Sequence, residues 1–256
     1  MIQEHIPMNK TLHSFEWMMV AISRLLKNNE TAATGTLSPV PAGGCLLAKA
    51  THAPDLMPMI YGDPDNWDFE GLHEFFGLAQ KGKIDVFFLS GIQIDRQGRI
   101  NLSVIGDYNR PKLRLPGGAG SNTMYAVGRR TILFAMTHTN RLFTSRVDFV
   151  NATAFDEGEA LPWRRGGLSH VVTPMCVMAF DTVQKQLVLK SLLPGATIEG
   201  VKENTGFDLD IEGRAVETIP PLTDAEYEAL RGVVRQQMMK IYPRFSARIW
   251  GNRGNA

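Results

Sequence analysis

The stretch Thr31-Ala-Ala-Thr-Gly-Thr-Leu-Ser-Pro-Val-Pro-Ala-Gly-Gly-Cys45 decides the fold class of this 256-residue chain. Its first six residues predict a short strand that runs into a loop rich in glycine and proline, and the following residues, Cys45 to Ala50, predict a helix. A strand, a glycine-bearing loop and a helix form the α/β unit in which ligands bind beyond the carboxyl end of the strand. An ordinary turn has the same appearance, so both interpretations of this loop stay open.

The composition favours a globular protein without a nucleic-acid surface. The chain is 44% hydrophobic, and its 27 basic and 26 acidic residues leave a formal charge of +1. A duplex-binding surface needs a larger basic excess. The two cysteines and six histidines show no metal-ligand spacing, so no metal is expected. No run reaches about 18 apolar residues, so we expect no membrane segment and a cytoplasmic location.

Apolar periodicity predicts helices on both sides of this unit. Helical spacing runs from Leu12 to Leu26, with Thr11 as the N-cap, and again from Phe69 to Lys83, with Leu72 among the residues turned inward. A shorter helix is expected over 123–127. Near the end, Thr223 and Glu226 have the spacing of a capping box and open a helix to about Lys240.

Strands are predicted where β-branched and aromatic residues gather between turn signals. A hairpin is expected where residues 92–95 and 99–105 flank Gly98, which can adopt a positive φ. The other predicted strands are 56–61, 84–89, 131–136, 147–150, 171–180 and 186–193. Residues 156–167 form the one loop polar enough to suggest a boundary.

A second glycine-rich stretch, Leu115-Pro-Gly-Gly-Ala-Gly-Ser-Asn122, precedes the helix expected at 123–127. Small side chains let backbone N–H groups approach a carbonyl or phosphate oxygen, so an oxyanion cradle is one interpretation. A structural turn is the other. Ser121 is expected to cap the following helix with its hydroxyl rather than to act as a nucleophile, because no base is placed beside it.

Several blocks of sequence resemble the B (beta) chain of family I CoA-transferases, glutaconate CoA-transferase above all. They are Ala53-Pro-Asp55, then Ile92-Gln-Ile-Asp-Arg-Gln-Gly-Arg-Ile-Asn101, then Ile105-Gly-Asp-Tyr-Asn-Arg-Pro-Lys-Leu-Arg-Leu-Pro-Gly-Gly-Ala-Gly120, and finally Glu203-Asn-Thr-Gly-Phe-Asp-Leu-Asp210. Together they stretch over most of the chain in the family's order, which makes the resemblance specific.

The resemblance implies an α/β fold with an open, mostly parallel sheet flanked by helices, in one domain spanning residues 1–256. It also implies an enzyme that works with a CoA-transferase alpha subunit, as a heterodimer or heterotetramer, on an acyl-CoA thioester and without a bound cofactor. The residues it assigns to substrate or CoA binding are Gly35, Gln93, Gly117, Gly118, Ala119, Gly120 and Ser121.

The sequence departs from the family at its nucleophile. In these transferases a glutamate of the B-type chain attacks the thioester, forming an acyl anhydride and then a glutamyl-CoA thioester. Counting from Ala53-Pro-Asp55, that position holds Tyr61, and a phenol, whose ordinary pKa is about 10, does not replace a carboxylate at pH 7 without strong activation. The nearby carboxylates that would serve instead are Asp63, Asp65, Glu70 and Glu74.

Three functions therefore stay open. The first is CoA transfer, in the catabolism of aromatic, steroid or dicarboxylic acids. The second is hydrolytic C–C ring opening or decarboxylation of an acyl-CoA, in which Tyr61 donates a proton or hydrogen bond to an enolate oxygen. The third is a non-catalytic subunit that completes the partner's site. Outside the CoA-transferase resemblance, the alternative is a sugar-phosphate isomerase of related fold, which requires phosphate-dependent binding by the chain alone.

Overall fold

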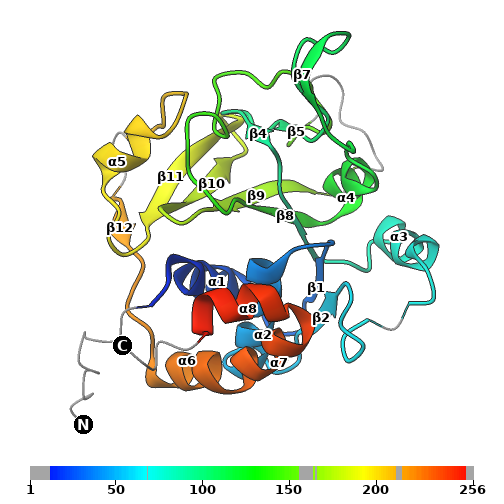
Figure 1. Ribbon diagram of the computed structural model, residues 1–256, viewed down its shortest axis with the longest axis vertical. Coiled ribbons are helices and arrows are strands. Elements are labelled where there is room, and N and C mark those ends of the chain that lie inside the picture. Colours follow the sequence, from blue (N-terminus) through cyan, green and yellow to red (C-terminus); the bar gives the residue numbers. More distant parts are fainter. Residues whose placement is uncertain (1–11, 68, 156–163, 165, 212–214, 252–256) are drawn as a thin grey trace.

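The computed structural model describes residues 12–67, 69–155, 164, 166–211 and 215–251 (Figure 1). Its centre is an eight-stranded sheet with the order β12-β11-β10-β9-β8-β3-β1-β2. The strands are β1 (Thr31–Thr34), β2 (Met57–Ile60), β3 (Val86–Leu89), β8 (Arg130–Phe134), β9 (Gly167–Val172), β10 (Cys176–Asp181), β11 (Gln186–Leu192) and β12 (Glu217–Thr218).

The sheet is mostly parallel, as predicted. Strands β2, β1, β3, β8 and β9 all run in the same direction, whereas β10 is antiparallel to both of its neighbours. The single strand expected over 171–180 is two strands, because the chain turns at Thr173 between β9 and β10.

Helices cover both faces of the sheet. One face carries α1 (Ser14–Leu25), α2 (Pro39–Ala50) and the C-terminal helices, and the other carries α3 (Leu72–Gln80) and α4 (Ser121–Val127). Alternation along β3 supplies both cores, because Phe88 faces the first and Phe87 the second. The C-terminal helices are α6 (Asp224–Ala229), the π-helical turn η1 (Leu230–Val234), α7 (Arg235–Ile241) and α8 (Pro243–Trp250).

Helix α2 begins at Pro39, six residues before the predicted start at Cys45, so that part of the prediction was wrong. Proline is tolerated in the first turn of a helix, where its missing N–H would have no partner anyway. Gly43 and Gly44 lie inside the helix because α1 packs closely on it: a Cβ on Gly44 would lie 2.5 Å from Ile22 Cγ2. Helix-to-helix contact therefore explains glycines that were expected to belong to a loop.

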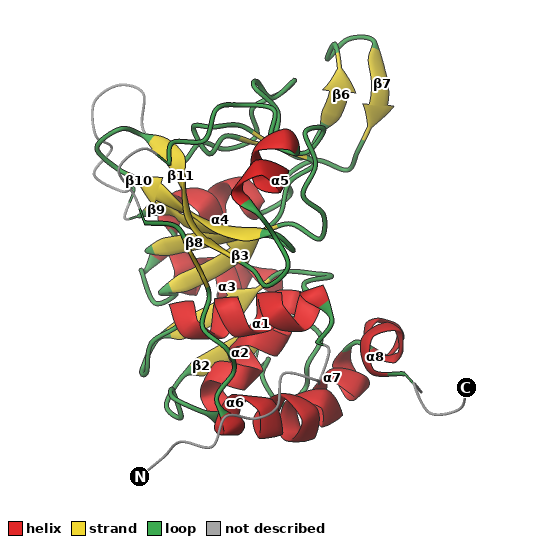
Figure 2. Ribbon diagram, turned by 90° about the vertical axis from the view of Figure 1, so that its left-hand side faces the viewer, coloured by secondary structure: helices red, strands yellow, loops and turns green. Residues whose placement is uncertain are grey.

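Two hairpins follow β3. The predicted one is confirmed as β4 (Gln93–Ile94) with β5 (Ile100–Asn101), and Gly98 has a φ of +70°. The second, β6 (Val104–Gly106) with β7 (Pro111–Arg114), was not predicted. Figure 2 shows it standing away from the rest of the molecule.

Other expectations are corrected in detail. Residues 147–150 do not form a strand. Instead, the Asp148 carboxylate accepts hydrogen bonds from the Gln93 side chain and from the Gly106 N–H of strand β6. The N-cap of α1 is His13 rather than Thr11, which lies outside the described residues. Leu72 is 50% exposed instead of facing inward. Most of the loop 156–167 also lies outside the described residues.

The capping box of Thr223 and Glu226 is confirmed, and the remaining helix, α5 (Ile198–Glu203), leads into the block 203–210. In the part of the chain that the structure describes, no helix is long and apolar enough to cross a bilayer.

Candidate functional site at the carboxyl edge of the sheet

The predicted site residues gather at the carboxyl edge of the parallel strands. Gly35 directly follows β1 and Tyr61 directly follows β2, and the register pairs Thr34 with Ile60, so the two residues are neighbours. Helices α3 and α4 lead into β3 and β8, which directs their first turns toward the same edge. This is where ligands bind in open α/β sheets.

An aromatic cluster, made of Tyr61, Trp67, Phe69, Phe75 and Phe76, links Tyr61 to the glycine-rich stretch. The Tyr61 and Trp67 rings meet edge to face, with centroids 5.0 Å apart, and Trp67 lies 5.1 Å from Phe75. Phe76 follows at 5.8 Å from Phe75 and packs on this stretch, where a Cβ on Gly120 would lie 2.0 Å from its Cζ. The structure thus brings together two segments that are far apart in sequence.

The loop from Gly117 to Ser121 (the glycine loop) has an unusual backbone. Gly117 has a φ of +90° and Ala119 a φ of +43°, and a left-handed non-glycine residue is costly unless its surroundings hold it there. The Gly117 N–H donates to the Leu102 carbonyl and the Ser121 N–H to the Gly118 carbonyl. Within the described chain, the N–H groups of Gly118, Ala119 and Gly120 meet no acceptor, so they are available to an oxyanion.

Ser121 does not cap α4 with its hydroxyl, so that expectation was wrong. It is the first residue of the helix, the N-cap is Gly120, and no side chain caps this end. The bend that a cap would stabilise is held instead by the bond from the Ser121 N–H to the Gly118 carbonyl.

Gly35 is not required by the backbone. A Cβ there would meet only Ser38 Oγ, at 3.9 Å, and its φ is not positive. Two residues on, Leu37 is left-handed, with a φ of +55°, and its side chain is 80% exposed. The β1–α2 loop therefore presents open space and a strained, exposed leucine at the carboxyl edge.

Gln93 is held in a closed network at the base of the β6–β7 hairpin. Its Nε2 donates to Asp148 at 3.0 Å, and its Oε1 accepts from the Asn101 side chain at 2.7 Å and from the Asp148 N–H. The Gly106 N–H donates to the same Asp148 carboxylate. This arrangement suits a residue that positions the hairpin better than one that touches substrate, and the predicted CoA contact of Gln93 stays a prediction.

Two of the four carboxylates near Tyr61 accept hydrogen bonds from the protein. Asp63 is buried, and its oxygens accept from the Asp65 N–H and the Asn66 side chain. Glu74 accepts from the Glu70 N–H. Asp65 and Glu70 themselves are exposed. Tyr61, 38% exposed, directly follows β2, and the exposed Asp65 and Glu70 are the carboxylates of this group that stay open to solvent.

His138, shortly after β8, is a buried structural residue. The Thr205 hydroxyl donates to the Val201 carbonyl, so His138 Nε2 donates to Thr205 Oγ1 at 3.0 Å, while Nδ1 accepts from the Thr173 hydroxyl at 2.9 Å. Burial lowers the pKa of His138 to about 4, so the ring is neutral at pH 7. Among the described residues, no group of three or more His, Cys, Asp or Glu side chains is placed to hold a metal.

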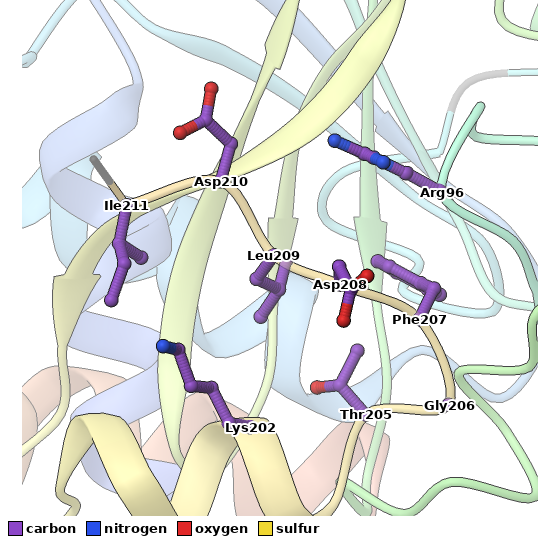
Figure 3. A pocket seen from close by; sticks show the side chains of 9 residues that line it. All are labelled: Arg96, Lys202, Thr205, Gly206, Phe207, Asp208, Leu209, Asp210 and Ile211. Atoms are coloured by element: carbon purple, nitrogen blue, oxygen red, sulfur yellow. The ribbon is translucent and has the colours of Figure 1, made fainter.

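A pocket of about 770 Å³ lies beside the block 203–210 (Figure 3). Asp210, which lines the pocket, forms an isolated β-bridge with Val188 of β11. The pocket therefore lies on the side of the sheet that contains the antiparallel strands β10 and β11. Its charged lining is mixed: Arg96 and Lys202 against Asp208 and Asp210. The pocket does not include Tyr61 or the glycine loop.

Sequence reasoning missed one residue of the carboxyl edge, Tyr242. Its hydroxyl is buried beside the Ser38 backbone and near Asp63, in a geometry too poor for an ordinary hydrogen bond. Burial raises the pKa of this phenol. No motif marks Tyr242, because only the packing of η1 and α7 on α2 brings it there.

Comparisons with known proteins agree with this architecture. The family model described as Coenzyme A transferase matches residues 60–204. The B chain of 3-oxoadipate CoA-transferase from Pseudomonas knackmussii is 33% identical over 85% of this chain and 92% of its own. The cholesterol ring-cleaving hydrolase IpdB subunit of Rhodococcus jostii is 27% identical over 88% of this chain and 93% of its own.

A third relative is known in sequence and structure. The B chain of glutaconate CoA-transferase from Acidaminococcus fermentans is 30% identical over 80% of this chain and 86% of its own. The crystal structure of glutaconate coenzyme A-transferase from that organism superposes with a TM-score of 0.75 at 25% identity, covering 87% of this chain and 94% of the other. Because the family model spans more than half of the chain and these relatives match most of its length, the chain belongs to the coenzyme A transferase family, as a chain of the B (beta) type.

Proposed function

We propose that this chain is the B-type half of a heteromeric cytoplasmic enzyme that processes acyl-CoA thioesters at the carboxyl edge, together with an A-type partner. The observation that carries the proposal is the convergence of Gly35, Tyr61 and the glycine loop at one edge of the sheet. The names of the relatives, each a subunit of a multi-chain enzyme, support the need for a partner.

The glycine loop has the chemistry to bind a thioester oxygen. The free N–H groups of Gly118, Ala119 and Gly120 are fixed before any ligand arrives, because Phe76 packs on the loop and the Gly117 and Ser121 N–H groups anchor its ends. Donors that are already oriented stabilise developing negative charge without reorganising. We therefore assign the loop to the thioester or enolate oxygen.

A second candidate function follows from Tyr61. This phenol stands where the family resemblance places a nucleophilic carboxylate, and the neighbouring Asp63 already accepts two hydrogen bonds. A neutral phenol donates a hydrogen bond, which suits protonation or stabilisation of an enolate. Hydrolytic C–C cleavage or decarboxylation of an acyl-CoA then replaces CoA transfer, and the similarity to a cholesterol ring-cleaving hydrolase chain supports this version.

Mass spectrometry of products separates the two reactions. The chain is co-expressed with its A-type partner and given glutaconyl-type and ring-bearing CoA esters, with and without acetate. Acetyl-CoA that forms only with acetate identifies a transferase. An ester that gains water or loses carbon dioxide regardless of acetate identifies a hydrolase or decarboxylase.

The substitution Tyr61→Phe tests the role of the phenol. Loss of the hydroxyl is expected to lower kcat by about 10²-fold or more if it stabilises the reacting oxygen. Tyr227→Phe on α6, outside the candidate site, is the matched control and should leave turnover unchanged. Full activity in Tyr61→Phe and in single substitutions of the nearby acids Asp63, Asp65, Glu70 and Glu74 would assign this chain a non-catalytic role instead.

A further inference from the structure

The charge of the chain is divided unevenly. Residues 230–256 contain six basic residues (Arg231, Arg235, Lys240, Arg244, Arg248 and Arg253) and no acidic residue. Subtracting these six from 27 leaves 21 basic against 26 acidic residues in the rest of the chain, a balance of −5. The near-zero total therefore conceals a basic C-terminal segment, and such an asymmetry points to an anionic partner. This segment lies outside residues 60–204 that the family model matches.

Three of these cations serve the packing of the C-terminal helices. Arg231 pairs with the buried Glu16 carboxylate at 2.8 Å. Arg235 donates to the Trp250 carbonyl, and Arg248 lies over the Phe15 ring. These side chains are held by the protein itself.

Lys240 and Arg244 are different. Both are exposed, and within the described chain neither has a carboxylate within ion-pair distance. They stand on either side of Tyr242, at the corner where α7 ends and α8 begins. Two unpaired cations at one corner attract an anion from solution more strongly than either alone.

The corner adjoins the candidate site. The Tyr242 hydroxyl is buried beside the backbone of Ser38, which belongs to the β1–α2 loop at the carboxyl edge. Phe245, one turn into α8, packs against the core that α1 and α2 form. Helix α7 lies beside α2 in Figure 1 and contacts it, whereas α8 contacts the start of α1 through the rings of Phe245 and Phe15.

We infer that Lys240 and Arg244 form a cationic rim of the site and bind the phosphate groups of the nucleotide end of CoA. The inference rests on the proposed function, because it takes the thioester end to lie at Tyr61 and the glycine loop. CoA is a long molecule whose thiol end is neutral and whose other end is a phosphorylated ADP. A ligand of this shape needs oriented donors for its thioester oxygen and positive charge for its phosphates. The glycine loop supplies the donors and the α7–α8 corner supplies the charge.

Binding measurements on the complex with the A-type partner test the rim. The probes are CoA and pantetheine, which lacks the nucleotide and all phosphates. In Lys240→Gln/Arg244→Gln we expect the Kd for CoA to rise about 3- to 10-fold, as for two exposed ion pairs, with a shallower salt dependence. The Kd for pantetheine should not change. The matched control is Lys27→Gln/Lys83→Gln, two exposed cations that precede β1 and β3 at the opposite edge of the sheet.

Any other result would contradict the proposal that Lys240 and Arg244 bind the phosphates of CoA. An unchanged Kd for CoA does so directly, and an equal loss for CoA and pantetheine shows that the variant disturbs the inner site. Weaker assembly of the complex with an unchanged Kd for CoA assigns the corner to the partner chain. If the unsubstituted complex fails to bind CoA, the proposed function fails as well, which separates that outcome from the first three.

Discussion

Gly35 is a residue whose backbone does not require glycine, since a Cβ would meet only Ser38 Oγ at 3.9 Å. We expect Gly35→Ala to leave stability within about 0.5 kcal/mol of the original chain but to weaken binding of the acyl-CoA, because the methyl group takes space beyond β1. Gly77→Ala in α3, where a Cβ meets nothing within 4 Å, is the control and should raise Tm slightly. Thermal unfolding and turnover of both variants give the answer, and equal turnover would place Gly35 outside the site.

His138 predicts how stability depends on pH. Its pKa is about 4 in the folded chain and 6.5 in the unfolded chain, so as pH falls below 6.5 the unfolded state takes up a proton that the folded state refuses. Stability is therefore lost as pH falls, by about 2 kcal/mol between pH 7 and pH 5 from this residue. Burial also lowers the pKa of His170 to about 4, so His170 likewise reduces the free energy of unfolding as the pH falls.

Denaturant unfolding at the two pH values, for the original chain and for His138→Gln, isolates the part due to His138. The variant should show a loss smaller by about 2 kcal/mol. Proton NMR titration of the His138 ring in the folded chain checks the same quantity without a substitution. A ring that titrates near 6.5 would contradict the prediction.

At the scale of elements, Glu16 joins the first helix to the last ones. It is buried in α1, and its carboxylate accepts from the Trp250 indole at 2.7 Å and from Arg231 at 2.8 Å. We expect Glu16→Gln to lower the free energy of unfolding by about 2 kcal/mol, because Arg231 loses its counter-charge in a partly buried place. Chemical denaturation of the original chain and of Glu16→Gln measures this difference in the free energy of unfolding. The exposed Glu228→Gln in α6 should change stability by less than about 0.5 kcal/mol, and an equal effect of both variants would show that the Glu16 contacts add nothing.

At the scale of the whole molecule, the carboxyl edge is open to solvent. Leu37 is 80% exposed and Tyr61 is 38% exposed there, which suits a surface that a partner covers. We expect the chain alone to be inactive and poorly soluble, and the complex with an A-type chain to be soluble and active. Gel filtration with light scattering and turnover of both preparations decide this. A stable, active monomer would contradict it.

The sequence predicted most elements because apolar runs and turn residues act locally. It failed where distant contacts decide. Pro39, Pro41, Gly43 and Gly44 have the composition of a loop, yet α1 packs on this segment and makes it a helix. Val147 to Val150 has the composition of a strand, yet Asp148 is held by Gln93 and Gly106 instead.

What the sequence determined by itself is the fold class, the position of Tyr61 at the end of a strand and the glycine loop before a helix, since each depends on short-range order along the chain. Only the tertiary structure decided that an aromatic cluster joins Tyr61 to Gly120 and that Tyr242 lies beside the Ser38 backbone at the same edge. The physical reason is that these neighbours are far apart along the chain, and parallel strands with helical crossovers bring them together.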